Sequence, residues 1–314
     1  MQRLIVQRII IAFLVMLTAS ILSFTLLFFA PGNPAEAIIR QRSGNDPTFA
    51  EIDLFLENHN LNKPFAAQCF QWLYMISRGD LGCSIKTGEP VLREFFDRFG
   101  ATLELALAAM FISLLIALPL GVLSAVRQNS VLDHLTRFVA LFGISIPEFW
   151  LGIMLMVLFS LTLGWLPCFG HGTVKHFILP AVTLGAGITA SLMRLVRSSM
   201  LEVLHLDYIK TARAKGLKET LIIWKHALKN ALVPVVTVFG TQLGHLLAGA
   251  VVVETVFSWP GIGKYLIDSI YARDYPVIQG FVFIIAAVFV LVNLLVDITY
   301  AYLDPRIRYE KGRG

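Results

Sequence analysis

The sequence predicts an all-α polytopic membrane protein with six transmembrane helices. Of its 314 residues, 56% are apolar and only 15% are charged, and its mean hydropathy is +0.71. An average soluble domain carries ~25% charged residues. Apolar runs of about 20 residues, the length that crosses ~30 Å of hydrocarbon, recur along the chain. This pattern excludes a disordered chain, a collagen-like repeat and a disulfide-rich secreted scaffold.

Six segments have the length of a membrane span. The first, Ile9–Ala30, follows two arginines as a signal peptide would, but its 22 uncharged residues exceed the ~7–15 of a signal-peptide core. We therefore expect it to remain as a membrane anchor. Of the six segments, only the third contains a charged side chain, Glu148. The remaining five are Leu105–Val126, Phe138–Leu163, Phe177–Met193, Ala231–Val253 and Val277–Val296.

The basic residues that flank the spans indicate how the chain is oriented. If the N-terminus is cytoplasmic, the inner segments carry 16 basic and 6 acidic residues, a net charge of +10. The outer segments then carry 10 basic and 12 acidic residues, a net charge of −2. Because basic residues concentrate on the cytoplasmic side, both termini are predicted to be cytoplasmic. The overall charge of +5 is thus a topology signal, and no nucleic-acid partner is expected.

The predicted topology divides the chain into three parts. Residues 1–30 form the cytoplasmic N-terminus and first span, residues 31–98 form an extracytoplasmic helical cap, and residues 99–314 form a transmembrane domain with five helices. In the cap, Thr48-Phe-Ala-Glu51 is typical of a capping box, and Pro64 opens a second amphipathic helix. We interpret this segment as a folded cap without chemistry of its own.

The largest predicted cytoplasmic loop, residues 199–230, contains a short helix. Asp207 suits the first turn of that helix because an acid is favourable at the positive end of the helix dipole, and Gly216 suits its end. Ala212 and Ala214 place small side chains between cations, as expected of a helix that docks closely in a partner's groove. A charged connector without a partner is the alternative.

The sequence contains no motif for nucleotide binding or hydrolysis. It lacks G-x-x-x-x-G-K-[ST], H-E-x-x-H and G-x-S-x-G, so we do not expect an enzyme. Cys168, His171 and His176 share one outer loop at spacings that a metal site could use. The loop is rich in glycine and proline and is more simply explained as a connection. We therefore expect no metal site.

Polar residues inside the spans are candidates for the transport pathway, because side chains at that depth usually face protein or water. Gln242 and His245 share one face of the fifth span, although a hydrogen bond between helices would also explain His245. Glu148 follows Pro147 in the third span and indicates a water-filled route or a helix break. Small residues that permit close helix packing recur in the fifth span at Gly240, Gly244 and Ala248.

All three cysteines fall on the predicted outer side. Cys69 and Cys83 both lie in the cap, and we hypothesise a disulfide between them. Three cysteines allow three pairings, and free thiols are equally compatible with the sequence.

Taken together, these segments resemble the membrane-spanning subunit of binding-protein-dependent ABC importers, in the branch that takes up dipeptides, oligopeptides and nickel. The resemblance covers essentially the whole chain. Its strongest element is Asp207–Leu217, followed by His226–Asn230 and Pro234, which is similar to the coupling segment of that family. Six shorter motifs support the resemblance and occur in the family's order along the chain, namely Arg78–Gly82, Ala101–Glu104, Ser145–Phe149, Phe257–Gly263, Arg273–Pro276 and Asp304–Arg308.

The resemblance implies the type I ABC importer permease architecture in a bacterial inner membrane, surrounded by lipid. An extracytoplasmic binding protein would deliver the substrate, two permease subunits, expected to be a heterodimer, would form the pathway, and two cytoplasmic ATPases would use ATP and Mg²⁺. This chain itself is expected to bind no cofactor. The residues expected to couple it to an ATPase are Asp207, Tyr208, Thr211, Ala212, Arg213, Ala214, Lys215 and Gly216.

The expected cargo is a small peptide or a nickel or other metal chelate. The short loop between the third and fourth predicted spans, Gly164–His176, is compatible with either class. The alternative to an ABC permease is a self-sufficient secondary transporter, which would often show an internal repeat and ion-coupling residues at the middle of the membrane. We find no convincing repeat.

Overall fold

The computed structural model describes the backbone of residues 2–303 and the side chains of residues 10–296, except at positions 34, 37, 41–43, 237, 248 and 249. The motif Asp304–Arg308 lies outside the described residues. Every regular element within them is a helix, which confirms the predicted all-α class. The chain forms two compact units, one made of the residues up to 101 with 260–291, and the other of residues 102–259 with those from 292 onward.

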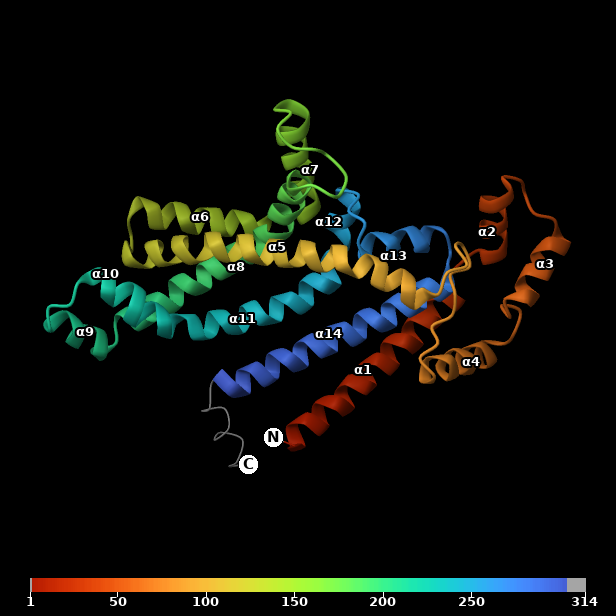
Figure 1. Cartoon of the computed structure of the whole chain (residues 1–314), viewed down its shortest axis with the longest axis horizontal. Coiled ribbons are helices and arrows are strands. Elements are labelled where there is room, and N and C mark those ends of the chain that lie inside the picture. Colours follow the sequence, from red (N-terminus) through yellow and green to blue (C-terminus); the bar gives the residue numbers. More distant parts are fainter. Residues whose placement is uncertain (1, 304–314) are drawn as a thin grey trace. The chain divides into compact units, whose positions relative to one another are not determined.

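The first unit contains four helices that precede the long helix starting at Val91, the first turns of that long helix, and two helical segments from the C-terminal part of the chain. The outer connection between the fifth and sixth predicted spans therefore contains a helix, at Ile262–Tyr271. The unit comprises α1 (Gln2–Phe28), α2 (Pro34–Ser43), α3 (Phe49–Asn58), α4 (Phe65–Ser77), the start of α5 (Val91–Val126), α13 (Ile262–Tyr271) and the start of α14 (Tyr275–Leu303) (Figure 1).

Local capping explains where the short helices of this unit begin. The Thr48 backbone N–H donates to Glu51 Oε2 at 2.8 Å, and the Glu51 backbone N–H donates to Thr48 Oγ1 at 3.4 Å. The predicted capping box is thus confirmed, and its hydrogen bonds hold the pKa of Glu51 below the ordinary value. Helix α4 begins directly after Pro64, as predicted, and Gly79 adopts a φ of +75° just beyond its end.

An aromatic and aliphatic cluster forms the core of the first unit. The Phe95 ring on α5 meets the Phe281 ring on α14 edge-on, with ring centroids 5.2 Å apart. Burying such side chains contributes ~1.5–3 kcal/mol each. Gly280 permits this close approach, because a Cβ there would lie 2.6 Å from Val91 Cγ1. The buried members are Phe24, Trp72, Leu81, Val91, Phe95, Ile262, Val277 and Phe281.

The second unit is organised around α8 (Val174–Leu204). This helix packs against α6, α7, α11 and α12, and 14 of its 31 residues are buried, so it forms the centre of the unit. The other elements are the rest of α5, α6 (Val131–Ser145), α7 (Glu148–Met156), η1 (Val157–Thr162), α9 (Asp207–Ala214), α10 (Glu219–Leu221), η2 (Ile222–Ala227), α11 (Leu228–Gly249), α12 (Val251–Val256) and the end of α14.

Among the residues that the structure describes, five helices are long and apolar enough to cross a membrane, or six if one bent pair counts as a span. That pair, α6 and α7 with η1, bends by 105°, so the third predicted span is broken near Glu148, where the sequence indicated a water-filled route or a helix break. The break lies at Ile146 and Pro147, where Ile146 is extended (φ −82°, ψ 128°) because the residue before a proline is disfavoured from helical geometry. Helix α5 begins at Val91 and crosses the predicted boundary at residue 98.

Candidate functional site

The predicted short helix in the 199–230 loop is present and is fixed at both ends. Helix α9 spans Asp207–Ala214, two residues fewer than predicted, and packs on η2 through Ile209, which is fully buried. The Tyr208 hydroxyl accepts a hydrogen bond from Asn230 Nδ2 at 2.7 Å and so ties α9 to the start of α11. Figure 1 shows α9 and α10 at one end of the second unit, where α8 ends and α11 begins.

The turn after α9 is also held by hydrogen bonds. Gly216 adopts a φ of +74°, a left-handed conformation that favours glycine, and its N–H donates to the Arg213 carbonyl at 2.9 Å. The Arg213 guanidinium binds Glu219 with its Nη2 atom 2.6 Å from Oε1. These hydrogen bonds raise the pKa of Arg213 above its ordinary value. The turn therefore has a defined shape, and one of its cations, Arg213, is paired with Glu219.

The outer surface of this segment combines cations with apolar side chains that sequence reasoning missed. Leu217, Leu221 and Trp224 are 38%, 40% and 51% exposed and line one shallow hollow. Their neighbours Ile222 and Ile223 in η2 are buried, so this stretch has an inner and an outer face. The predicted coupling residues on the exposed surface are Asp207, Tyr208, Thr211, Arg213, Ala214, Lys215 and Gly216, with Ala212 half-buried.

A buried ion pair, also missed by sequence reasoning, joins three helices of the second unit. Asp133 is fully buried and accepts hydrogen bonds from Arg197 Nε at 2.7 Å and Nη2 at 2.9 Å. Ser124 Oγ donates to the same carboxylate at 2.5 Å, and the Asn129 backbone N–H donates at 3.0 Å. The carboxylate thus links the end of α5, the start of α6 and α8. Its position three residues after Ser130, the N-cap of α6, is the only local signal of a structural role.

The pathway candidates lie on two different helices. Glu148 is the first residue of α7, directly after the break, and a Cβ added at Gly187 of α8 would lie 4.0 Å from its Oε1 atom. The predicted helix break at this position is confirmed. Gln242 is half-buried and His245 is exposed on α11. The break therefore places a carboxylate beside a helix position that has no side chain.

The predicted small-residue seam has one described partner. A Cβ at Gly240 would lie 3.3 Å from both methyl groups of Val296 at the end of α14, so that glycine admits a close neighbour. Gly244 is buried. The side chain of Ala248 lies outside the described residues.

The hypothesised disulfide is absent, because Cys69 and Cys83 are both free thiols. Cys69 lies on the face of α4 that packs against the aromatic cluster, whereas Cys83 is exposed and its backbone forms a bridge with Pro90. Their separate packing explains why the prediction was wrong. Among the described residues no three His, Cys, Asp or Glu side chains are grouped as a metal site.

Residues of two motifs that were singled out in the sequence form buried hydrogen bonds with distant segments of the same unit. In the first unit, the buried Asp274 carboxylate accepts from Ser84 Oγ at 2.5 Å and from the backbone N–H groups of Ile85 and Lys86, each at 3.1 Å. In the second unit, Thr102 Oγ1 donates to the buried Glu254 Oε1 at 2.6 Å. These motifs hold distant segments of the chain together.

Comparison with known families decides the identity. Residues 117–309 match the binding-protein-dependent transport system inner membrane component, and residues 1–106 match the N-terminal component of such membrane subunits. The chain belongs to this family of permeases. It is a transport subunit of an ABC importer and an inner-membrane protein, and its family works with a partner permease, an ATPase and a binding protein.

Curated relatives cover nearly the whole permease. The dipeptide transport system permease DppB of Alkalihalophilus pseudofirmus is 40% identical over 96% of this chain and 98% of that protein. The glutathione transport system permease GsiC of Pectobacterium atrosepticum is 43% identical over 94% of this chain and 95% of its own. DppB of Escherichia coli K12 is 42% identical over 93% and 94%.

Solved structures support the predicted type I ABC importer permease architecture. A chain of the inward-facing MetNI methionine ABC transporter has a TM-score of 0.56 at 20% identity, covering 68% of this permease and 97% of the other chain. An amino acid ABC transporter solved with histidines has a TM-score of 0.51 at 16% identity, covering 75% and 98%. The comparisons give no support to a self-sufficient secondary transporter.

Proposed function

We propose that this permease imports short peptides, as one half of a heterodimeric pathway in the bacterial inner membrane. An extracytoplasmic binding protein delivers the peptide, and two ATPases on the cytoplasmic side, where both chain termini lie, use ATP and Mg²⁺. The support for this substrate class is that the relatives at 40–43% identity are named as dipeptide, di/tripeptide and glutathione permeases. None of these names supports nickel or another metal chelate as cargo.

The main support for a coupling role is the attachment of α9 to the neighbouring helical segments. Its buried Ile209 and the Tyr208–Asn230 hydrogen bond fix α9 to η2 and α11, and α8 leads directly into it. A displacement of α9 by an ATPase therefore moves the ends of both helices instead of being absorbed by a loose loop. We define the coupling surface as Asp207–Gly216 with the exposed apolar residues Leu217, Leu221 and Trp224.

The chemistry of the coupling surface suits a protein partner. The exposed apolar side chains provide the contact area that a docking interface buries, and the cations beside them provide orientation. Ala212 and Ala214 leave room for a groove to approach the helix backbone. No phosphate-binding loop occurs in the sequence, so the ATP that drives this movement binds to the partner.

For the pathway, we propose that Glu148, Gln242 and His245 face the route of the peptide. A short peptide carries a positively charged amino group, and the Glu148 carboxylate at the break beside Gly187 offers it an opposite charge. Gln242 and His245 can exchange hydrogen bonds with peptide groups. Gly240, Gly244 and Ala248 let α11 approach its neighbours closely, and so set the position of these two side chains.

ATP-driven peptide uptake by the complete importer in proteoliposomes tests the coupling surface. Ala212→Glu adds bulk and charge at a half-buried position of that surface, and we expect uptake to fall at least about tenfold, which corresponds to a loss of ~1.4 kcal/mol of coupling. Membrane insertion should be unchanged. Gln128→Glu, which places a similar charge on an exposed turn predicted to lie on the same side, should transport normally.

The outcome that contradicts this assignment is full uptake by Ala212→Glu. Equal loss in both variants would show a general effect of added negative charge and would contradict it as well. A separate competition experiment tests the substrate class: unlabelled dipeptide should reduce the uptake of the labelled peptide, and nickel should not. Uptake driven by an ion gradient without ATPase subunits would refute the importer mechanism itself.

A further inference from the structure

Helix α4 has apolar side chains on two opposite faces. On the inner face, Trp72 belongs to the buried core of the first unit, and Phe65 and Ile76 pack against that core. On the opposite face, Phe70 and Tyr74 are 75% and 55% exposed and lie one turn apart, and we call them the exposed stripe. The 13 residues of α4 include no Asp, Glu, Lys or Arg, although a helix face in water usually carries charged side chains.

Ring contacts with α1 set the position of α4 along the first membrane span. The centroid of the Phe65 ring lies 5.5 Å from that of Phe24 and 5.1 Å from that of Phe28. Both phenylalanines belong to the last turns of the apolar span Ile10–Phe28, and residues four apart share one face of a helix. Helix α4 therefore begins beside the end of the span, at the boundary between the hydrocarbon and the lipid headgroups.

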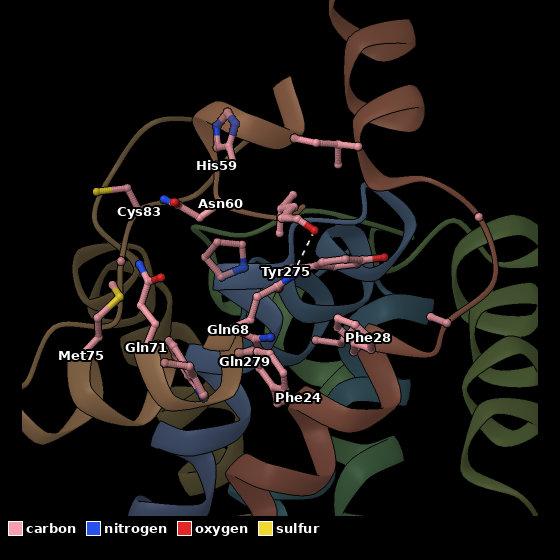
Figure 2. A pocket seen from close by; sticks show the side chains of 18 residues that line it. Phe24, Phe28, His59, Asn60, Gln68, Gln71, Met75, Cys83, Tyr275 and Gln279 are labelled. Atoms are coloured by element: carbon pink, nitrogen blue, oxygen red, sulfur yellow. Dashed lines mark hydrogen bonds between the residues drawn. The ribbon is translucent and has the colours of Figure 1, made fainter. Parts of the chain in front are cut away.

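A cavity of about 450 Å³ in the first unit shows that the exposed stripe faces away from the other helices. Figure 2 shows Phe24 and Phe28 of α1 lining this cavity together with Gln71 of α4. Phe70 and Tyr74 do not line it, and neither belongs to the buried core. The stripe is thus directed outward from the unit.

The surface of α1 beside α4 is also apolar and exposed. Leu22, Leu26 and Phe29 are 57%, 72% and 72% exposed, as expected of a span that faces lipid. The centroid of the Phe29 ring lies 6.0 Å from that of Phe65, so this surface continues onto the start of α4. Lipid that surrounds the end of α1 therefore reaches α4 as well.

Basic residues flank α4 at both ends. Lys63 precedes the helix and is exposed, and Arg78 follows it with its guanidinium carbon 4.3 Å from the centroid of the Tyr74 ring. Asp80, the nearest acid in the sequence, accepts a hydrogen bond from the Gly82 N–H at 2.8 Å in the next turn. An apolar helix face with cations beside it is typical of helices that lie in the membrane interface, where anionic lipids attract the cations.

We propose that α4 is an interfacial membrane helix that binds an anionic phospholipid surface. Phe70 and Tyr74 insert at the boundary between headgroups and acyl chains, and Lys63 and Arg78 pair with lipid phosphates. The cap is then held to the bilayer by α4 in addition to its chain connection to α1. This role does not depend on which cargo the permease transports.

A fluorescent probe on the exposed stripe tests the proposal. The full chain carrying Cys69→Ala, Cys83→Ala and Cys168→Ala has no thiol of its own, so bimane can be attached through Phe70→Cys alone. The labelled chain is then studied both by itself and assembled into the complete importer, in nanodiscs of phosphatidylcholine and phosphatidylglycerol. We expect phospholipid brominated on its acyl chains to quench the probe in both preparations, and aqueous iodide to leave it bright.

Two reference positions calibrate this result. Bimane at Leu26→Cys, in the α1 span, should respond as it does at position 70. Bimane at Glu57→Cys, an exposed acidic position of α3, should show the reverse pattern, with quenching by iodide and none by the brominated lipid.

Variants of Arg78 test the phosphate contact separately. Phosphatidylglycerol should raise the melting temperature of the chain above its value in phosphatidylcholine, and Arg78→Gln should reduce that rise, whereas Arg78→Lys should retain it. Comparing the two lipids within each variant removes the effect of the lost contact with Tyr74. Arg93→Gln is the matched control, because Arg93 Nη1 already lies 3.0 Å from Glu89 Oε2, and it should show the same rise as the parent chain.

Three results would overturn the proposal. Quenching at position 70 by iodide and not by lipid would show that the stripe faces water. Quenching by lipid in the isolated chain, with protection from both quenchers in the importer, would show that a partner subunit covers the stripe. An equal rise in melting temperature for Arg78→Gln and the parent chain would show that Arg78 does not bind lipid phosphate.

Discussion

Replacing Asp133 by asparagine should destabilise the second unit by about 3–5 kcal/mol, the usual effect of removing one partner from a buried ion pair. The Asp133 side chain is fully buried and that of Arg197 is 18% exposed, so the cation cannot be rehydrated without moving. The carboxylate accepts four described hydrogen bonds, from Ser124, Asn129 and twice from Arg197. An asparagine accepts through one oxygen only, and its NH₂ group would face another donor.

The assay is reversible unfolding of the purified chain in mixed detergent micelles, with a double-mutant cycle. Asp133→Asn and Arg197→Gln should each be strongly destabilising, whereas the double variant should lose clearly less than the sum, because neither charge remains unpaired. Arg137→Gln is the matched control. Its side chain is 46% exposed and its Nε atom lies 3.9 Å from Asp133 Oδ1, so its removal should change stability by only ~0–1 kcal/mol.

Additive effects in this cycle would refute the reasoning, since additivity means that the two side chains do not interact energetically. A loss from Asp133→Asn no larger than that from Arg137→Gln would refute it equally. If the cycle behaves as expected, the same variants should reduce ATP-driven uptake, because the ion pair connects α5, α6 and α8 and α8 leads into the coupling surface.

Two further predictions concern the first unit. Gly280→Ala should cost ~1–3 kcal/mol in the same unfolding assay, because the new Cβ would lie 2.6 Å from Val91 Cγ1, whereas Gly100→Ala, with nothing within 4 Å, should be neutral or stabilising; the reverse order would contradict the packing argument. Ser84→Ala should cost ~1.5–3 kcal/mol by removing the 2.5 Å hydrogen bond to the Asp274 carboxylate, and an unchanged unfolding midpoint would exclude that contribution.

Features that depend on neighbouring residues were predictable. The capping box of Thr48 and Glu51, the start of α4 after Pro64 and the short helix at Asp207 all follow from hydrogen bonds or backbone preferences within a few residues. Span positions were predictable for the same reason, since an apolar run of sufficient length is itself the condition for crossing hydrocarbon. The helix break at Pro147 was visible too, because proline restricts the residue before it.

The size of that break was not predictable. A proline disfavours helical geometry at Ile146, but the bend of 105° depends on what α7 packs against. At Gly152, a Cβ would lie 3.1 Å from the Phe257 ring and 3.2 Å from Thr183, so α7 is positioned by a residue about 100 positions away in the sequence. Likewise, the two cap cysteines suggested a disulfide from their types alone, and their separate packing leaves them as free thiols.

By itself, the sequence determined that this chain is an α-helical membrane permease with a short, charged coupling helix, because hydropathy, capping and motif order are properties of nearby residues. Only the tertiary structure decided which charges are buried and paired. Asp133 meets Arg197 across 64 positions, and Asp274 meets Ser84 across 190. The sequence around a carboxylate does not indicate which distant residue will pair with it. Packing determines that partner, because an unpaired charge becomes unfavourable once packing removes it from water.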